Sequence, residues 1–307
     1  MSDIKLFRIS DSGITALSGT TDTVEKSVQN LFEAQMEALL GVRFLASEFV
    51  TTNGGRIDSL GIDENGCPVI IEYKRAMNEN VINQGLFYMD WLLDHRKDFQ
   101  WLTMERLGQA VAAQVQWSSP RLICIAGDFS RYDNFAVKQM PHNIELVRYR
   151  RFGGDLMLLE VVASSSGKMT PISEKDVSAA SQATGNGYKQ KTVTEVMANL
   201  SADMIDRYEA LRAFIMALGD DIQENTLQLY VAFKRLKNIA CVEFRARDAK
   251  IIVFLRVDPK TVILEDGFSR DVSEIGHYGT GDLELSLMKA SDLEKAMPLI
   301  KRSYENA

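Results

Sequence analysis

The sequence lacks the features that mark secreted and membrane proteins. Its first residues, MSDIKLFRIS, contain neither a long apolar stretch nor a small-residue cleavage site, so we predict no signal peptide. No run of about 18 apolar residues occurs, which argues against a membrane span. The three cysteines, Cys67, Cys124 and Cys241, lie far apart with no CxxC pair, which disfavours a disulfide framework and a zinc knuckle. We therefore expect a protein of the reducing cytoplasm.

Several catalytic signatures are also missing. Residues 276–281 (GHYGTG) are glycine-rich but lack the G-K-[ST] of a P-loop, so they are compatible either with a tight connection or with a phosphate contact. His95, His142 and His277 have no partners at metal-ligand spacing, and no nucleophile elbow accompanies them. The absence of a dinucleotide fingerprint disfavours a metabolic α/β enzyme.

The chain length and composition indicate two domains of an ordinary globular protein. The chain has 307 residues, 46% of them hydrophobic and 25% charged. After residue 163 the composition shifts to Ser, Thr, Gly and Lys, and apolar periodicity disappears. We therefore expect a first domain over residues 1–163, a flexible linker over 164–200 and a smaller domain over 201–307.

The first domain shows an alternation of helical and strand patterns. Helices are expected at residues 23–40, 81–95 and 135–139, and strands at 44–51, 56–62, 68–74, 121–127, 144–150 and 156–162. This order predicts a mixed α/β sheet flanked by helices on both faces. In the second domain, helices at 208–218 and 293–304 and strands at 226–235, 240–246 and 250–257 predict an α+β fold.

Two strands of the first domain bring together residues suited to metal chemistry. Side chains alternate along a strand, so Glu72 and Lys74 point the same way, and Asp58 on the preceding strand reaches the same end of the sheet. Two carboxylates and the Tyr73 carbonyl would suit Mg²⁺, with Mn²⁺ as an alternative. A lysine beside the cation would orient a water and stabilise charge on a phosphate. A cross-strand ion pair at a sheet edge is the competing interpretation.

The arrangement resembles the PD-(D/E)XK nuclease superfamily over roughly residues 22–162. Asp58 stands at the first Asp of that motif, in "ID" rather than "PD", and Glu72 and Lys74 stand at its E-x-K. Gln84 and Tyr88, on one face of the next predicted helix, look like the Q-x-x-x-Y motif of the RecB-like branch. The resemblance implies a restriction-endonuclease-like fold with all five residues at the active site.

Members of this superfamily often add an acidic residue from the first helix. Glu33 and Glu37 share a face of the predicted helix, and Glu37 is our choice because it is nearer to the strand that follows. Ordinary solvated helix acids are the alternative. The second half resembles a small, poorly characterised α/β domain found downstream of such nucleases and sometimes labelled a transport protein, a label to which the lack of a membrane segment gives little weight.

A basic segment stands out in an acidic chain. Residues 234–256 contain seven Lys or Arg and two acids, which gives this segment a charge of +5. Because the whole chain has a net charge of −7, the rest of the chain carries −12. A basic patch is a surface for phosphate contacts. The predicted contacts to nucleic acid are Lys234, Arg235, Lys237, Arg245 and Arg247. A solvated hairpin face is the alternative.

Together these patterns predict a Mg²⁺-dependent endonuclease of defence, restriction or repair. DNA is favoured over RNA as the substrate, no membrane partner is expected, and a homodimer is left open. The alternative is a nuclease-like protein that binds or scaffolds nucleic acid with little turnover, because a fold alone does not establish activity.

Overall fold

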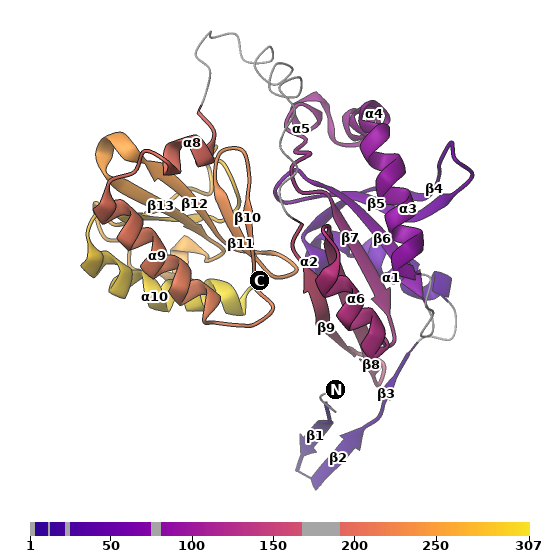
Figure 1. Ribbon diagram of the computed structural model, residues 1–307. Coiled ribbons are helices and arrows are strands. Elements are labelled where there is room, and N and C mark those ends of the chain that lie inside the picture. The colour runs from indigo at the N-terminus through magenta and orange to yellow at the C-terminus, as the bar shows by residue number, and fades with distance from the viewer. Residues whose placement is uncertain (1–3, 12, 22–24, 75–80, 168–190) are drawn as a thin grey trace.

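The chain folds into an α/β N-terminal domain, a smaller α+β C-terminal domain and a small N-terminal hairpin (Figure 1). The computed structural model describes residues 4–11, 13–21, 25–74, 81–167 and 191–307. No helix within these ranges combines the length and the apolar character needed to cross a bilayer.

The N-terminal domain is built on a mixed sheet whose strand order is β3-β8-β7-β6-β5-β4, with β9 paired to β8. β4, β5 and β6 are antiparallel, whereas β6, β7 and β8 are parallel. The strands are β3 (Gly19–Thr20), β4 (Val42–Val50), β5 (Arg56–Asp63), β6 (Pro68–Lys74), β7 (Arg121–Ala126), β8 (Asn143–Phe152) and β9 (Leu156–Ser165). The helices are α1 (Glu25–Ala34), α2 (Met36–Leu40), α3 (Val81–Asp94), α4 (Arg96–Leu107), α5 (Gln109–Ala112) and α6 (Arg131–Gln139).

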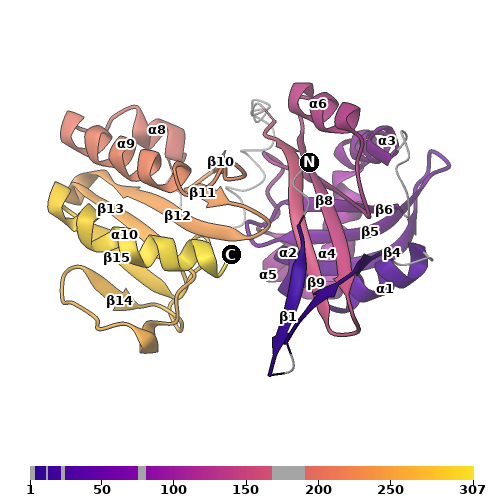
Figure 2. The same cartoon turned by 90° about the horizontal axis from the view of Figure 1, so that it is seen from below.

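Helices cover both faces of this sheet, because its central strands are apolar on both sides. α1 packs Val28 and Phe32, and α2 packs Met36 and Leu40, against one face, where Tyr73 is buried. α3, α4 and α6 cover the other face, and Figure 2 shows α3 and α6 on the side of the strands opposite α1. The expected mixed α/β sheet flanked by helices is confirmed.

The structure corrects some of the expected boundaries in this domain. The first helix is interrupted at Gln35, which has φ −134° and ψ 26°, so its last turn becomes the separate helix α2. α4 and α5 were not expected, because few of their residues are buried and no apolar stripe is visible in their sequence. The short helix α6 begins four residues earlier than predicted, at a capping box formed by Ser130 and Asp133.

The C-terminal domain is an antiparallel sheet with helices on one face. The strand order is β10-β11-β12-β13-β15-β14, and α9 and α10 pack on the side that carries Val242, Val253 and Leu285. The helices are α8 (Val193–Met197), α9 (Ala202–Met216) and α10 (Ala290–Glu305). The strands are β10 (Gln223–Thr226), β11 (Val231–Lys234), β12 (Asn238–Arg245), β13 (Lys250–Leu255), β14 (Ser269–Asp271) and β15 (Leu283–Leu287).

The smaller α+β domain is thus confirmed, with two changes. The single strand expected over residues 226–235 is two strands, β10 and β11, joined by a turn in which Leu227 N–H bonds the Tyr230 carbonyl. Of the expected linker, residues 168–190 lie outside the described residues, and its final part forms α8, which starts at a capping box of Thr192 and Glu195.

A buried polar cluster joins the two domains at the amino ends of the parallel strands. The Arg121 guanidinium bonds both Glu145 oxygens at 2.9 Å and Asp63 at 3.0 Å, and the Lys234 ammonium, from the C-terminal domain, bonds Glu145 at 2.9 Å. All four side chains are at most 3% exposed. Beside them, Asn65 exchanges amide hydrogen bonds with Asn238. We call the four charged residues the docking cluster.

The N-terminal hairpin extends away from the N-terminal domain (Figure 1). It pairs β1 (Leu6–Ser10) with β2 (Gly13–Leu17), placing Ile9 opposite Ile14 and Phe7 opposite Ala16. These apolar side chains share one face and are largely exposed. The hairpin was not expected, because a two-stranded unit has no buried face to impose an apolar periodicity of useful length.

Candidate active site

Asp58 and Glu72 face each other on neighbouring strands. The register that pairs Ser59 with Ile71 places Asp58 opposite Glu72. The Asp58 backbone N–H donates to Glu72 Oε1 at 3.2 Å, and the Tyr73 backbone N–H donates to Asp58 Oδ2 at 3.0 Å. Each carboxylate is therefore oriented by the backbone of the opposite strand, and the structure brings these two predicted residues together.

Glu72 is a buried carboxyl group with an unsatisfied oxygen. Its side chain is 0% exposed, and its Oε2 has no hydrogen-bond partner in the described part of the chain. Burial, and then the charge of Asp58, raise the pKa of Glu72 to about 9. Burial also raises the pKa of Asp58. Two acids that destabilise each other's charged forms need a proton or a cation between them.

Lys74 completes the predicted core. It lies two residues beyond Glu72 on β6, its side chain is 17% exposed, and its Nζ is 3.5 Å from Oε1 of Glu25. Glu25 is the first residue of α1. The ammonium is therefore bonded to the helix, and it lies close enough to Asp58 and Glu72 for its charge to act on both acids.

The first helix contributes through a different set of residues from the one expected. Glu25, Gln29 and Glu33 recur every four residues on the face of α1 that meets β5. The Gln29 amide donates to the Asp58 carbonyl at 2.8 Å and to Glu33 at 2.9 Å, and Ser59 donates to Glu33 at 2.6 Å. The i, i+4, i+8 spacing of these polar residues was a usable signal in the sequence.

Glu37 does not reach this site. It lies on α2, beyond the break at Gln35, and its side chain is exposed. The change of direction between the helices separates it from the face that carries Gln29. Glu25, which meets Lys74, therefore replaces Glu37 as the helix acid nearest to the predicted core.

Gln84 and Tyr88 lie beside the start of β5. The Gln84 amide donates to the Tyr88 hydroxyl at 3.0 Å, and that hydroxyl accepts from the Arg56 backbone N–H at 3.3 Å. A side chain at Gly55 would collide with the Tyr88 ring, so the two approach closely. The pair therefore fixes the strand two residues before Asp58.

The donor set fits a hard cation that keeps part of its water shell. Nowhere in the described ranges do three or more His, Cys, Asp or Glu side chains gather as a metal cluster, so Asp58 and Glu72 are the carboxylates in question. Mg²⁺ commonly uses one or two carboxylates and retains several waters. The Tyr73 side chain is buried under α1, which leaves its backbone carbonyl as the group it could offer.

The basic segment does not form one surface. Lys234 belongs to the docking cluster and is 1% exposed, so it cannot meet a phosphate. Arg235 pairs with Asp221 at 2.7 Å, and Lys237 is half-buried where the β11–β12 turn meets the N-terminal domain. Charge counting along the sequence misses this, because β12 carries the chain about 23 Å from that turn to Arg245.

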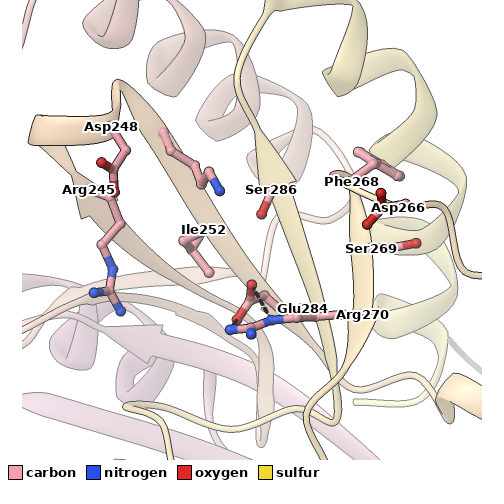
Figure 3. A pocket seen from close by; sticks show the side chains of 11 residues that line it. Arg245, Asp248, Ile252, Asp266, Phe268, Ser269, Arg270, Glu284 and Ser286 are labelled. Carbon is pink, nitrogen blue, oxygen red and sulfur yellow. Dashed lines mark hydrogen bonds and ion pairs between the residues drawn. The ribbon is translucent and has the colours of Figure 1, made fainter.

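Arg245 lies on a charged depression of about 380 Å³ on the sheet face opposite α9 and α10 (Figure 3). Figure 3 shows Arg245 and Arg270 on either side of Ile252, with Arg270 bonded to Glu284 at 2.8 and 2.6 Å. The basic residues lining it are Arg245, Lys250 and Arg270, and the acidic ones are Asp248, Asp266 and Glu284. The charges cancel, so this surface does not favour a polyanion.

The chain has a relative that covers its whole length. A protein of Haemophilus influenzae (strain ATCC 51907 / DSM 11121 / KW20 / Rd), described as an uncharacterized protein, is 31% identical over 312 residues, which span 99% of this chain and 100% of that protein. The chain belongs to the family of this Haemophilus protein. Residues 193–307 of this chain match a domain of unknown function, DUF5655.

Some solved structures share limited similarity with part of this chain. A repair endonuclease from Pyrococcus abyssi has a TM-score of 0.28 at 20% identity, over 44% of this chain and 50% of that chain. EndoMS in apo form has a TM-score of 0.26 at 18% identity, over 44% and 50% of the two chains. The chain matches about half the length of each.

Proposed function

We propose that the protein is a metal-dependent phosphodiesterase that cleaves nucleic acid, with DNA as the favoured substrate. The observation that carries the proposal is Glu72, a fully buried carboxyl group with an unpartnered oxygen beside Asp58. A buried acid in this position is costly in a purely structural role, because nothing among the described residues satisfies its Oε2. A bound cation supplies the missing partner.

The residues of the site have separable roles in this reaction. Asp58 and Glu72 would hold a divalent cation, Mg²⁺ or Mn²⁺, which would neutralise charge on the phosphate. The Lys74 ammonium orients a water for in-line attack and stabilises the negative charge that develops on the phosphate oxygens. Glu25 holds that ammonium at the edge of the sheet, and Gln29 fixes the backbone of Asp58.

Outside this core, two features support nucleic acid as the substrate. Gln84 and Tyr88 occupy the positions that the Q-x-x-x-Y resemblance assigns to the surroundings of a nuclease site. Of the basic segment, Arg247 is exposed and has no charge partner among the described residues, so it stays available for a phosphate contact. Endonuclease action in defence, restriction or repair is a further part of the proposal.

The test is cleavage of plasmid and of single-stranded DNA with Mg²⁺, with Mn²⁺ and with chelator. We expect cleavage only with a divalent cation, and a loss of about 100-fold or more in Lys74→Ala and in Glu72→Gln. Lys97→Ala, an exposed lysine on α4, is the matched control and should cleave like wild type. Binding of DNA without cleavage in the wild type would instead favour a nuclease-like binding protein, and equal cleavage by Lys74→Ala would refute the assignment.

A further inference from the structure

Glu48 has an unusual backbone conformation next to the proposed site. Its φ is +54°, and among the residues that the structure describes the other non-glycine with positive φ is Ala249, in a hairpin turn. Glu48 lies inside β4, between Ser47, which pairs with Ser59, and Phe49, which pairs with Ile57. It therefore stands across from Asp58. The left-handed region costs such a residue about 1–2 kcal/mol.

The Glu48 carboxylate bridges two cations from different elements. Its Oε1 accepts from Lys26 Nζ of α1 at 2.9 Å, and its Oε2 is 2.7 Å from Arg56 Nε of β5. The cationic side chains are 48% and 64% exposed. Ion pairs this exposed contribute about 0–1 kcal/mol each, so together they at most offset the backbone strain. Strain that persists without a clear gain in stability points to function.

The bridged cations flank the proposed site. Arg56 precedes Asp58 by two residues on β5, so it lies on the same side of the strand at about 7 Å. Lys26 follows Glu25, the residue that meets Lys74, and it also donates to the Gln29 amide oxygen at 3.0 Å. With one carboxylate between two cations, the group keeps a charge of +1 and exposes its donors to solvent.

We propose that Lys26, Glu48 and Arg56 form a subsite for a backbone phosphate of the nucleic acid strand, next to the phosphate that is cleaved. The subsite rests on the proposed function and adds a contact that positions the strand. Glu48 acts as a clamp: its left-handed backbone places the carboxylate where it holds both cations, so that they need not be ordered when the strand binds. A fixed pair of donors loses less conformational entropy on binding than two free side chains.

Equilibrium binding of labelled DNA with Ca²⁺ in place of Mg²⁺, measured over about 50–200 mM salt, tests the subsite. We expect Lys26→Ala and Arg56→Ala each to lower affinity roughly threefold to tenfold and to reduce the salt slope by about 0.9, the value for one phosphate contact. Arg56→Ala keeps its backbone bond to Tyr88, so this change leaves the strand in place. In turnover with Mg²⁺ it should raise KM and leave kcat unchanged.

The Glu48→Asn variant distinguishes the positioning of Lys26 and Arg56 by Glu48 from the effect of its negative charge on DNA binding. Asparagine tolerates the left-handed region, so we expect an unchanged or higher melting temperature. The variant removes a negative charge, and charge alone would tighten DNA binding. The clamp predicts weaker binding, by roughly threefold, because the cations lose their fixed positions. Tighter binding by Glu48→Asn would overturn the clamp.

The matched control is Arg212→Ala in the C-terminal domain. Arg212 is likewise a partly exposed arginine bonded to a carboxylate, Glu224, at 2.7 Å. We expect its affinity and salt slope to match wild type. If wild type binds and cleaves DNA but the Lys26 and Arg56 variants behave like the control, the subsite is refuted and the proposed function stands. If wild type neither binds nor cleaves, the proposed function itself fails.

Discussion

Glu72 and Glu145 are both buried glutamates of the same sheet, and their surroundings shift their pKa values in opposite directions. Glu72, near the carboxyl end of β6, has one oxygen without a partner among the described residues, and burial and then the nearby Asp58 raise its pKa to about 9. Glu145, near the amino end of β8, is also penalised by burial, but the charges of Arg121 and Lys234 outweigh that penalty and lower its pKa to about 2.

The difference shows what each end of the sheet is built for. A carboxylate whose oxygens are all bonded to cations, as in the docking cluster, has no capacity left for a ligand. At the carboxyl edge, one oxygen of Glu72 has no partner among the described residues, and this is the position where the proposed cation would bind. Both glutamates are buried, so the difference between them lies in the number of satisfied carboxylate oxygens.

The largest effect expected on stability comes from breaking the docking cluster. Arg121→Met leaves Asp63 and Glu145 buried with Lys234 as their one remaining cation. Removal of one partner from a buried ion pair typically costs about 3–5 kcal/mol. Urea unfolding at neutral pH measures it, with the exposed Arg212→Met as the comparison. A loss below about 1 kcal/mol would mean that the cluster is not buried in solution.

Glu72→Gln should act in the opposite direction in the metal-free protein. The raised pKa means that the fold favours the protonated acid, so its contribution to stability is complete below the unfolded pKa and declines as pH rises towards about 9. A neutral amide avoids that decline. We expect a gain on the order of 2 kcal/mol at pH 7, and little gain at pH 4, in chemical unfolding with chelator present. A destabilised variant at pH 7 would show that Glu72 has a structural partner.

Metal binding should be coupled to loss of the Glu72 proton. At neutral pH the cation must displace the Glu72 proton, so affinity should rise up to tenfold per pH unit and level off near pH 9. Calorimetry with Mn²⁺ in buffers of different ionisation enthalpy should show close to one proton released at pH 7. Asp58 and Glu72 titrate as a coupled pair, so the release belongs to the pair. A metal affinity that is independent of pH would contradict the raised pKa of Glu72 and therefore its contrast with Glu145.

The smallest effect is expected at Gln84. Gln84→Ala removes one hydrogen bond to Tyr88, whose hydroxyl still accepts from the Arg56 backbone. We expect a loss of about 1 kcal/mol or less in stability and a fall in cleavage of less than tenfold. A loss as large as that of Lys74→Ala would instead place Gln84 in contact with the substrate.

Local patterns in the sequence were enough to predict β6 and its acid. The run from Pro68 to Ile71 is apolar, and the Asp58, Glu72 and Lys74 positions follow from strand alternation once the hairpin is assigned. These features depend on residues close together in the chain, where the period of two and the turn signals apply.

The docking cluster could not be predicted, because its residues are far apart in the chain. Asp63, Arg121, Glu145 and Lys234 come from four strands of two domains, and each alone is an ordinary charged residue. Lys234 was expected on the surface because it lies in a basic segment, and only the packing of the β11–β12 turn against the N-terminal domain shows it to be buried. Similarly, the helix break at Gln35 moves Glu37 away from the site, and no glycine or proline near Gln35 indicates the break in the sequence.

The parallel strands have one end in each of the two regions compared above. β7 begins at Arg121, in the docking cluster, and ends at Ala126, which pairs with Lys74. β7 therefore spans the about 17 Å between the docking cluster and the strand position beside Lys74. One strand borders both regions: its first residue meets the C-terminal domain through the docking cluster, and its last residue lies next to the proposed site.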